Sequence, residues 1–134
     1  DEFEWKDKNG PMALLAEDNA VLRMVAYKFL KLCKVRCTAV EDGLLAVETY
    51  DRDRESFDII FMDIEMPKLT GDLVARDIRS IDATIPIIAL TANALQGDRE
   101  KCFAAGMTDF LTKPLRLETI KIYLHKHLAA SQRA

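Results

Sequence analysis

Five polar side chains at the ends of short apolar runs in this sequence could together carry out phosphoryl transfer. Glu17 and Asp18 follow the first run, Asp63 ends the third, Thr91 ends the fourth and Lys113 follows the fifth. A carboxylate can attack phosphorus, while a divalent cation and an ammonium group offset the charge of the phosphoryl oxygens. Asp63 would then be the nucleophile and would become an aspartyl phosphate.

Asp63 on its own allows a second interpretation. It ends an apolar stretch that begins at Phe57, is too short for a helix and is rich in β-branched and aromatic residues, which predicts a buried parallel strand. Pro67 prevents the strand from continuing. An aspartate after a strand is most often a helix or turn cap. The nucleophile hypothesis therefore depends on the other four groups.

The placement of these groups requires a sheet of five strands. Short apolar runs predict strands at residues 12–16, 35–40, 57–63, 85–91 and 109–112. Helical spacing predicts helices at residues 20–33, 43–50, 71–81, 94–105 and 115–128, with an exposed charged connection at 51–55. Strands that alternate with helices form right-handed crossovers, so the predicted fold is α/β, an open parallel sheet with helices on both faces.

Apolar spacing and capping residues define the predicted helices. The apolar residues of the first helix are expected on one broad face, which consists of Val21, Leu22, Val25, Ala26, Phe29, Leu32 and Cys33. Asp18 or Asn19 can cap this helix, and Thr70 can cap the third. Gly106 is expected to end the fourth helix, because glycine adopts the left-handed cap conformation at little cost.

All five polar groups are expected at one edge of this sheet, where the carboxyl ends of the strands form the ligand crevice of open α/β folds. Three carboxylates there repel one another, by about 4 kcal/mol per pair at about 4 Å and an effective dielectric of about 20. Lys113 supplies only one positive charge. A site of oxygen ligands without His or Cys selects a hard cation, and Mg²⁺ fits it better than Ca²⁺, which needs more oxygen ligands.

Composition excludes several other classes of protein. The formal net charge is −3, and no basic stripe interleaved with aromatic residues is present, so direct nucleic-acid binding is not expected. The apolar runs are too short to cross a bilayer and no leader precedes them, so no membrane contact is expected. Three cysteines in apolar contexts suit reduced core thiols in the cytoplasm.

One domain is expected between residues 12 and 128. Residues 1–11 are polar and contain Asn9-Gly10-Pro11, which predicts a linker or a remnant of cloning, although Phe3 and Trp5 could dock on the domain. Residues 129–134 are expected to form a short tail. The chain is either a stand-alone protein or part of a longer one.

Four stretches of the sequence resemble the receiver domains of two-component response regulators. They are Leu14-Leu-Ala-Glu17-Asp18-Asn19, Met62-Asp63-Ile-Glu-Met66-Pro67 with Gly71, Leu90-Thr91-Ala92-Asn93-Ala94, and Asp109-Phe110-Leu-Thr-Lys113-Pro114. The segment from Thr91 to Met107 is most similar to receivers of hybrid histidine kinases. The resemblance covers residues 12 to about 128 and implies a flavodoxin-like sheet with strand order 2-1-3-4-5.

The resemblance also implies roles for the residues of the site. Mg²⁺ would be held by Glu17, Asp18, Asp63 and the backbone carbonyl of Glu65. Asp63 would accept the phosphoryl group from a phosphohistidine of a histidine kinase or a histidine phosphotransfer protein. Such a domain is not a dedicated enzyme, although it catalyses its own phosphorylation and dephosphorylation, and its parent chain can be a histidine kinase.

Further implied features concern the phosphoryl oxygens and the conformational switch. Thr91 and Lys113 would bind the phosphoryl group, and the Lys113–Pro114 peptide bond would be cis. The Thr91 hydroxyl would move toward the phosphoryl group, and Phe110 would rotate into the space released. The surface formed by the fourth helix, the fifth strand and the fifth helix would then change.

Two other functions and one docking surface also merit consideration. An aspartate-nucleophile phosphatase would use Glu65 as general acid, but that class usually has its nucleophile after the first strand and adds a cap. A binding module that has lost phosphorylation usually lacks one of the acidic residues or the lysine, and all are present here. Leu22 and Met24, near the start of the first helix, could form part of a docking patch for a histidine phosphotransfer protein.

Overall fold

The computed structural model describes residues 4–93 and 96–128, which form one parallel sheet with the strand order β2-β1-β3-β4-β5. The strands are β1 (Met12–Ala16), β2 (Arg36–Val40), β3 (Ile59–Asp63), β4 (Ile87–Thr91) and β5 (Asp109–Thr112). The helices are α1 (Ala20–Leu32), α2 (Gly43–Asp53), α3 (Gly71–Arg79), α4 (Gln96–Ala104) and α5 (Leu117–His127), with a 3₁₀ turn η1 (Arg54–Ser56). The predicted α/β architecture and strand order are confirmed.

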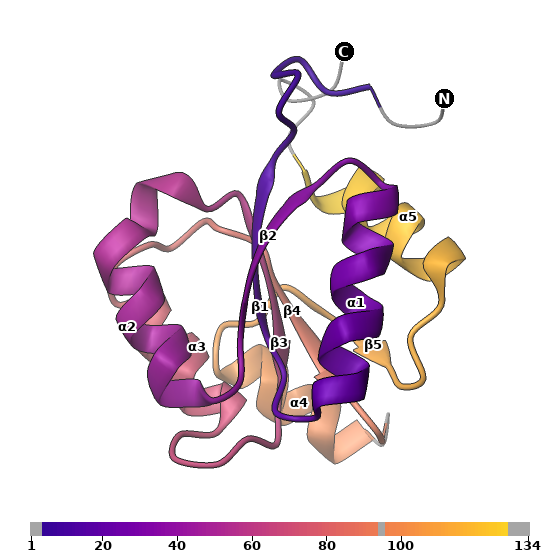
Figure 1. Cartoon of the computed structure of the whole chain (residues 1–134). Helices are drawn as coiled ribbons and strands as arrows, with labels where there is room; N and C mark the ends of the chain where they lie inside the picture. The colour runs from indigo at the N-terminus through magenta and orange to yellow at the C-terminus, as the bar shows by residue number, and fades with distance from the viewer. Residues whose placement is uncertain (1–3, 94–95, 129–134) are drawn as a thin grey trace.

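Helices cover both faces of the sheet, with α1 and α5 on one side and α2 and α3 on the other (Figure 1). Side chains alternate along each strand, so that Leu14 and Ile60 pack toward α2 and α3 while Leu15 and Phe61 pack toward α1 and α5. Every residue of β3 and β4 is buried. A parallel sheet covered on both faces produces such uninterrupted apolar strands. The strand ends are therefore rigid supports for the loops that follow them.

The face of α1 that contacts the sheet differs from the prediction. Ala26 and Leu30 are buried, whereas Val21 and Leu32 are 63% and 66% exposed. Apolar residues surround most of this helix, and the pattern alone therefore does not identify the stripe that the sheet covers. An apolar surface remains open to solvent on α1.

Helices α2 and α3 end elsewhere than the sequence suggested. The charged run at 51–55 was expected to be a connection, but α2 continues to Asp53 and is followed by η1. No Gly or Pro interrupts this run, and exposed charged residues are compatible with a last helical turn. Helix α3 ends at Arg79 rather than Ile81, and Thr70 occupies its N-cap position without a side-chain capping bond.

Gly106 ends α4 as predicted. Its φ is +95°, and the Met107 N–H donates to the carbonyl of Cys102 at 3.0 Å. This bond satisfies a carbonyl that the helix leaves unpaired at its end. The expected start of this helix at residue 94 lies outside the described residues, as do Phe3 and the tail at 129–134. Within the described ranges, no helix is long and apolar enough to cross a bilayer.

The segment 4–11 packs against the sheet edge at which the strands begin. Trp5 is 9% exposed, and its indole N–H donates to the carbonyl of Cys33 at 3.0 Å. The guanidinium of Arg36 donates to the carbonyl of Gly10 at 3.1 and 3.0 Å. Trp5 thus docks on the domain, which the sequence left open for this segment, and its ring belongs to the apolar cluster under α1 and α5.

Candidate functional site

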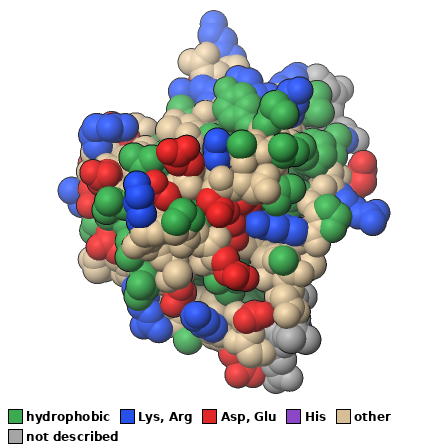
Figure 2. Space-filling model, turned by 60° about the horizontal axis from the view of Figure 1, so that its bottom comes forward, with side chains coloured by type: hydrophobic (Ala, Val, Ile, Leu, Met, Phe, Trp, Pro, Cys, Tyr) green, Lys and Arg blue, Asp and Glu red, His purple; other side chains and the backbone are tan. Residues whose placement is uncertain are grey.

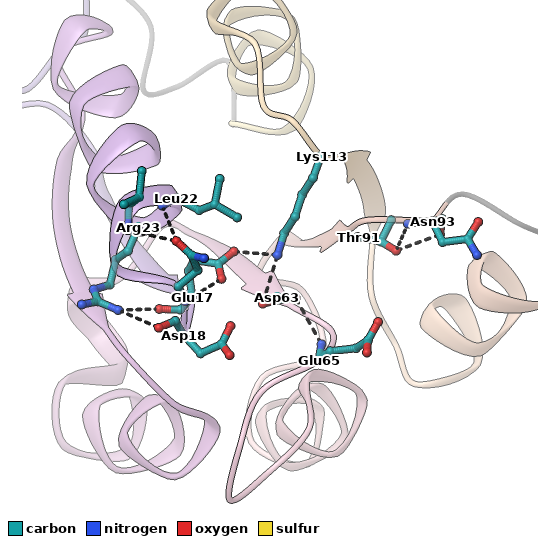
Figure 3. Close-up of polar contacts among 11 residues, drawn as sticks. Glu17, Asp18, Leu22, Arg23, Asp63, Glu65, Thr91, Asn93 and Lys113 are labelled. Carbon is teal, nitrogen blue, oxygen red and sulfur yellow. Dashed lines mark hydrogen bonds and ion pairs between the residues drawn. The ribbon is translucent and has the colours of Figure 1, made fainter.

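Three carboxylates meet at the carboxyl edge of the sheet. Because β1 and β3 are neighbours, with Ala16 opposite Met62, the residues that follow lie side by side. Carboxylate oxygens of Glu17, Asp18 and Asp63 lie within 4.8 Å of one another. Glu17 and Asp63 are buried, whereas Asp18 is exposed. Figure 2 shows acidic side chains grouped near the middle of this face, and Figure 3 shows the cluster itself.

Lys113 reaches this cluster from the end of β5. Its ammonium nitrogen lies 2.8 Å from Oε1 of Glu17 and 3.1 Å from Oδ2 of Asp63 (Figure 3). Burial alone would lower the pKa of Lys113, but the bonds to the two carboxylates outweigh it and raise the pKa, so the side chain stays charged. The Lys113–Pro114 peptide bond is cis, as the resemblance implies.

Both carboxylate oxygens of Asp63 accept a contact. Oδ1 accepts the backbone N–H of Glu65 at 3.1 Å, and Oδ2 faces Lys113. Burial, and then the neighbouring Glu17, raise the pKa of Asp63 to about 7, although Lys113 opposes this. For Asp18, burial also raises the pKa, but bonds to Asp63 and Glu17 outweigh it, so its pKa falls below the usual range. The ammonium group of Lys113 contacts two of the three clustered carboxylates, so the cluster keeps an excess of acidic groups.

The donor set at this edge fits Mg²⁺. The three converging groups offer only carboxylate oxygens, which suit a hard divalent cation. A cation there would offset the negative charge of Glu17, which adds to burial in raising the pKa of Asp63. The exposure of Asp18 leaves one side of the cluster open to solvent. Incoming ligands such as water or phosphate oxygens can therefore reach it.

Helix α1 begins with contacts that fix the acidic pair. The Asn19 side chain caps α1 by accepting the N–H groups of Val21 and Leu22, both at 3.0 Å. Of the two predicted caps, Asn19 is therefore the one used. Its own N–H donates to Oε2 of Glu17 at 3.0 Å, which orients that carboxylate.

Arg23 supports the same loop and was not among the predicted site residues. Its guanidinium donates to the backbone carbonyl of Glu17 at 2.9 Å and to that of Asp18 at 3.4 Å (Figure 3). In the sequence, Arg23 is only a charged residue on the polar side of the helix. Its place in the first turn after an acidic pair was the available signal, since a side chain there can fold back onto the loop.

Gly71 allows α3 to begin directly beneath Asp63. A Cβ at this position would lie 2.3 Å from the backbone oxygen of Asp63. The Gly71 N–H donates to the carbonyl of Ile64 at 2.8 Å, which closes the loop between β3 and α3. Any side chain here would push the backbone of Asp63 away from its neighbours.

Thr91 lies at the same edge, but its hydroxyl contacts the loop after β4. The hydroxyl donates to the carbonyl of Asn93 at 2.8 Å and accepts the Asn93 N–H at 3.0 Å. Figure 3 shows this pair apart from Asp63 and Lys113. The structure thus brings four of the five predicted groups together, with the Thr91 hydroxyl engaged elsewhere.

Phe110 on β5 is half-buried and contacts two side chains of α4. The ring of Phe103 meets it edge-on with centroids 6.3 Å apart, and the guanidinium of Arg99 lies 4.8 Å from its centroid. On α1, Met24 is 51% exposed and Leu22 is half-buried. Met24 is thus accessible for docking, whereas Leu22 is only partly so.

The family model described as "Response regulator receiver domain" matches residues 13–125. The chain is 38% identical to the transcription factor SKN7 of Chaetomium thermophilum over 93% of its own length and 16% of that protein. It is 33% identical to the hybrid signal transduction histidine kinase K of Dictyostelium discoideum, over 90% of its own length and 10% of the kinase. The chain therefore spans only a small part of these relatives.

Solved structures give a similar result. The receiver domain of sensor histidine kinase PA1611 from Pseudomonas aeruginosa, which holds a magnesium ion in its active-site cleft, is 43% identical, with a TM-score of 0.81 over 88% of this chain and 97% of that one. A second match is the complex from Saccharomyces cerevisiae between the histidine phosphotransfer protein Ypd1 and the receiver domain of Ssk1. The matching chain is 27% identical, with a TM-score of 0.81 over 91% of both chains.

Proposed function

This chain belongs to the response regulator receiver domains of two-component systems, and we propose that it accepts a phosphoryl group from a phosphohistidine onto Asp63. The observation that supports this most is the convergence of Glu17, Asp18 and Lys113 on Asp63 at the end of the central strand. A carboxylate nucleophile, a cation site and an ammonium group within one crevice are the components of a phosphoryl-transfer centre.

In the proposed reaction, a carboxylate oxygen of Asp63 attacks the phosphorus of the donor phosphohistidine. The P–N bond breaks, its electron pair stays on the imidazole nitrogen, and an acyl phosphate forms. Lys113, already paired with Oδ2 of Asp63, is close enough to transfer its contact to a phosphoryl oxygen. Mg²⁺ bound by Glu17, Asp18, Asp63 and the backbone carbonyl of Glu65 would offset charge on the phosphoryl oxygens.

Phosphorylation would change the surface of the domain through Thr91 and Phe110. The Thr91 hydroxyl would exchange its two contacts with the Asn93 backbone for a contact with a phosphoryl oxygen. Phe110 would then leave its contacts with Phe103 and Arg99 and rotate inward. The surface formed by α4, β5 and α5 would carry the signal. An added charge of nearly two units suits such a two-state response.

We further propose that the partner is a histidine kinase or a histidine phosphotransfer protein that docks beside the site at Leu22 and Met24. The exposure of Met24 supports this, because the residue lies on the helix that begins directly after the acidic pair. Met24→Asp is expected to slow phosphotransfer from such a protein but not phosphorylation by acetyl phosphate. Equal rates with the wild type for both donors would remove Met24 from the docking surface.

We place this reaction in the cytoplasm and treat the chain as a signalling module rather than a dedicated enzyme. No disulfide joins Cys33, Cys37 and Cys102 in the structure, which fits a reducing compartment. The domain would catalyse only its own phosphorylation and hydrolysis. Glu65 contacts Asp63 through its backbone N–H. This contact does not use the Glu65 carboxyl group, which a phosphatase would need as its general acid.

The test is incubation with acetyl phosphate or beryllofluoride, with and without Mg²⁺, using wild type and Asp63→Asn. We expect a phosphoryl mass increase and amide shifts around Thr91 and Phe110 only in the wild type with Mg²⁺. An adduct that forms without metal, or at another residue, would contradict the mechanism. Repeated turnover of a small phosphate ester would instead favour the phosphatase.

A further inference from the structure

The loop between β3 and α3, residues 64–70, begins at Asp63 and is held at both of its ends. At its start, the Glu65 N–H donates to Oδ1 of Asp63 at 3.1 Å. At its close, the Gly71 N–H donates to the carbonyl of Ile64. Its far part, at Lys68 and Leu69, instead contacts the beginning of α2. Those contacts take no part in the proposed phosphoryl transfer itself.

Gly43, the first residue of α2, touches the loop through backbone atoms. A Cβ on Gly43 would lie 1.8 Å from the carbonyl oxygen of Leu69 and 2.7 Å from its carbonyl carbon. Heavy atoms cannot approach so closely, and the atoms that would have to move are backbone rather than a flexible side chain. Any side chain at Gly43 must therefore displace either the loop or the helix.

Asp42 and Lys68 add a second contact between α2 and the loop. Asp42 is 3% exposed; its Oδ1 accepts the Leu45 N–H at 2.8 Å, and its Oδ2 lies 3.4 Å from the ammonium of Lys68. Lys68 has a φ of +69°, a conformation that is uncommon for lysine. The ion pair thus joins a buried carboxylate to the strained point of the loop.

These two contacts fix the far part of a loop whose first residues orient Asp63. We propose that Asp42, Gly43 and Lys68 form a brace. In this brace, the start of α2 positions the loop so that the Glu65 N–H can donate to the carboxylate of Asp63. The brace residues touch neither the metal ligands nor the phosphoryl group and act as positioning residues. This inference rests on the proposed role of Asp63.

A purely structural alternative is that Asp42 only caps α2, and the two roles can be separated. Capping uses Oδ1 of Asp42, whereas the brace uses Oδ2 and the ammonium of Lys68. Lys68→Gln removes the ion pair and leaves the cap intact. Because the Lys68 side chain is 63% exposed, this variant is expected to fold. Gly43→Ala tests the backbone contact.

The experiment is an Mg²⁺ titration of the ¹⁵N-labelled chain, monitored by amide shifts, with urea unfolding of each variant alongside. We expect Gly43→Ala to weaken Mg²⁺ binding about tenfold, the lower end of what loss of a supporting contact usually costs. Lys68→Gln should weaken it roughly two- to fivefold, as for a partly exposed ion pair. In both variants the Glu65 amide resonance should shift before Mg²⁺ is added.

Two controls match these changes. Gly97→Ala places a Cβ where, among the described residues, no heavy atom beyond the adjacent backbone of α4 lies within 4 Å, and Arg52→Gln removes an exposed ion pair on the last turn of α2. Both should keep the Mg²⁺ affinity and the Glu65 resonance of the wild type. Reduced stability of Lys68→Gln with an unchanged affinity and Glu65 resonance would overturn the brace, even if Gly43→Ala fails to fold.

The proposed function is tested separately by beryllofluoride and acetyl phosphate on the wild type. If the wild type takes up neither at Asp63, the proposed function fails whatever the brace variants do. If the wild type reacts and both brace variants bind Mg²⁺ like the controls, only the brace fails.

Discussion

Asp63→Asn should stabilise this domain in the absence of Mg²⁺, although it removes the proposed phosphoacceptor. Asp63 is buried beside Glu17, and both effects raise its pKa from 3.8 to about 7. A raised carboxyl pKa means that the folded state binds the proton more tightly than the unfolded state. The contribution of Asp63 to stability is therefore greatest below its unfolded pKa and is lost as pH rises toward about 7.

The expected size of this effect follows from the same pKa values. The difference between 3.8 and about 7 corresponds to about 4 kcal/mol of unfavourable free energy for the charged form. Solvent beside Asp18 screens part of this, and asparagine loses the charged contact with Lys113. We therefore expect a stabilisation of about 1–2 kcal/mol near pH 8, which becomes smaller toward about pH 5.

Urea unfolding followed by circular dichroism, with and without excess Mg²⁺, measures this difference. Mg²⁺ should stabilise the wild type and have little effect on Asp63→Asn, so the order of stabilities should reverse when Mg²⁺ is saturating. Asp51→Asn, an exposed carboxylate on α2, is the control and should change neither quantity. A variant that is less stable than the wild type near pH 8 without Mg²⁺ would refute the reasoning.

Three further predictions concern groups around the sheet. Lys113→Gln leaves Glu17 and Asp63 facing each other and should lower the free energy of unfolding by about 2 kcal/mol without weakening Mg²⁺ binding, as urea unfolding and an NMR titration will show. Gly71→Ala should cost more than about 2 kcal/mol, read from the urea midpoint, because its Cβ would lie 2.3 Å from backbone. Asp109→Ala should cost about 1–2 kcal/mol at neutral pH. Burial raises the pKa of Asp109, but the Phe110 N–H, His127 and Lys126 outweigh it and lower the pKa. The difference should therefore vanish as unfolding is followed to acidic pH, below the folded pKa.

The sheet and most of the site could be predicted because both follow from local rules. Each central strand is an uninterrupted apolar run that stops at a polar residue, and parallel strands place such stops at one edge. Glu17 and Asp63 meet for this reason alone, since β1 and β3 are in register at Ala16 and Met62. Lys113 follows from the same rule, two strands away.

Contacts that depend on loop conformation could not be predicted in this way. The contact of Arg23 with two carbonyls, the engagement of Thr91 with Asn93 and the left-handed backbone of Lys68 each require a specific turn. The orientation of α1 was misjudged because apolar residues occur on several of its sides, so spacing alone did not identify Ala26 and Leu30 as the residues that pack in the cluster with α5.

The docking of Trp5 has a practical consequence for all of these measurements. It is the only tryptophan of the chain, and it lies beside Cys33 at the start of the strands, while the carboxylate cluster lies at their other ends. As an intrinsic fluorophore, it should change its emission when the polypeptide unfolds and respond little to chemistry at the opposite edge. Unlabelled samples of each variant can thus be compared by their emission spectra.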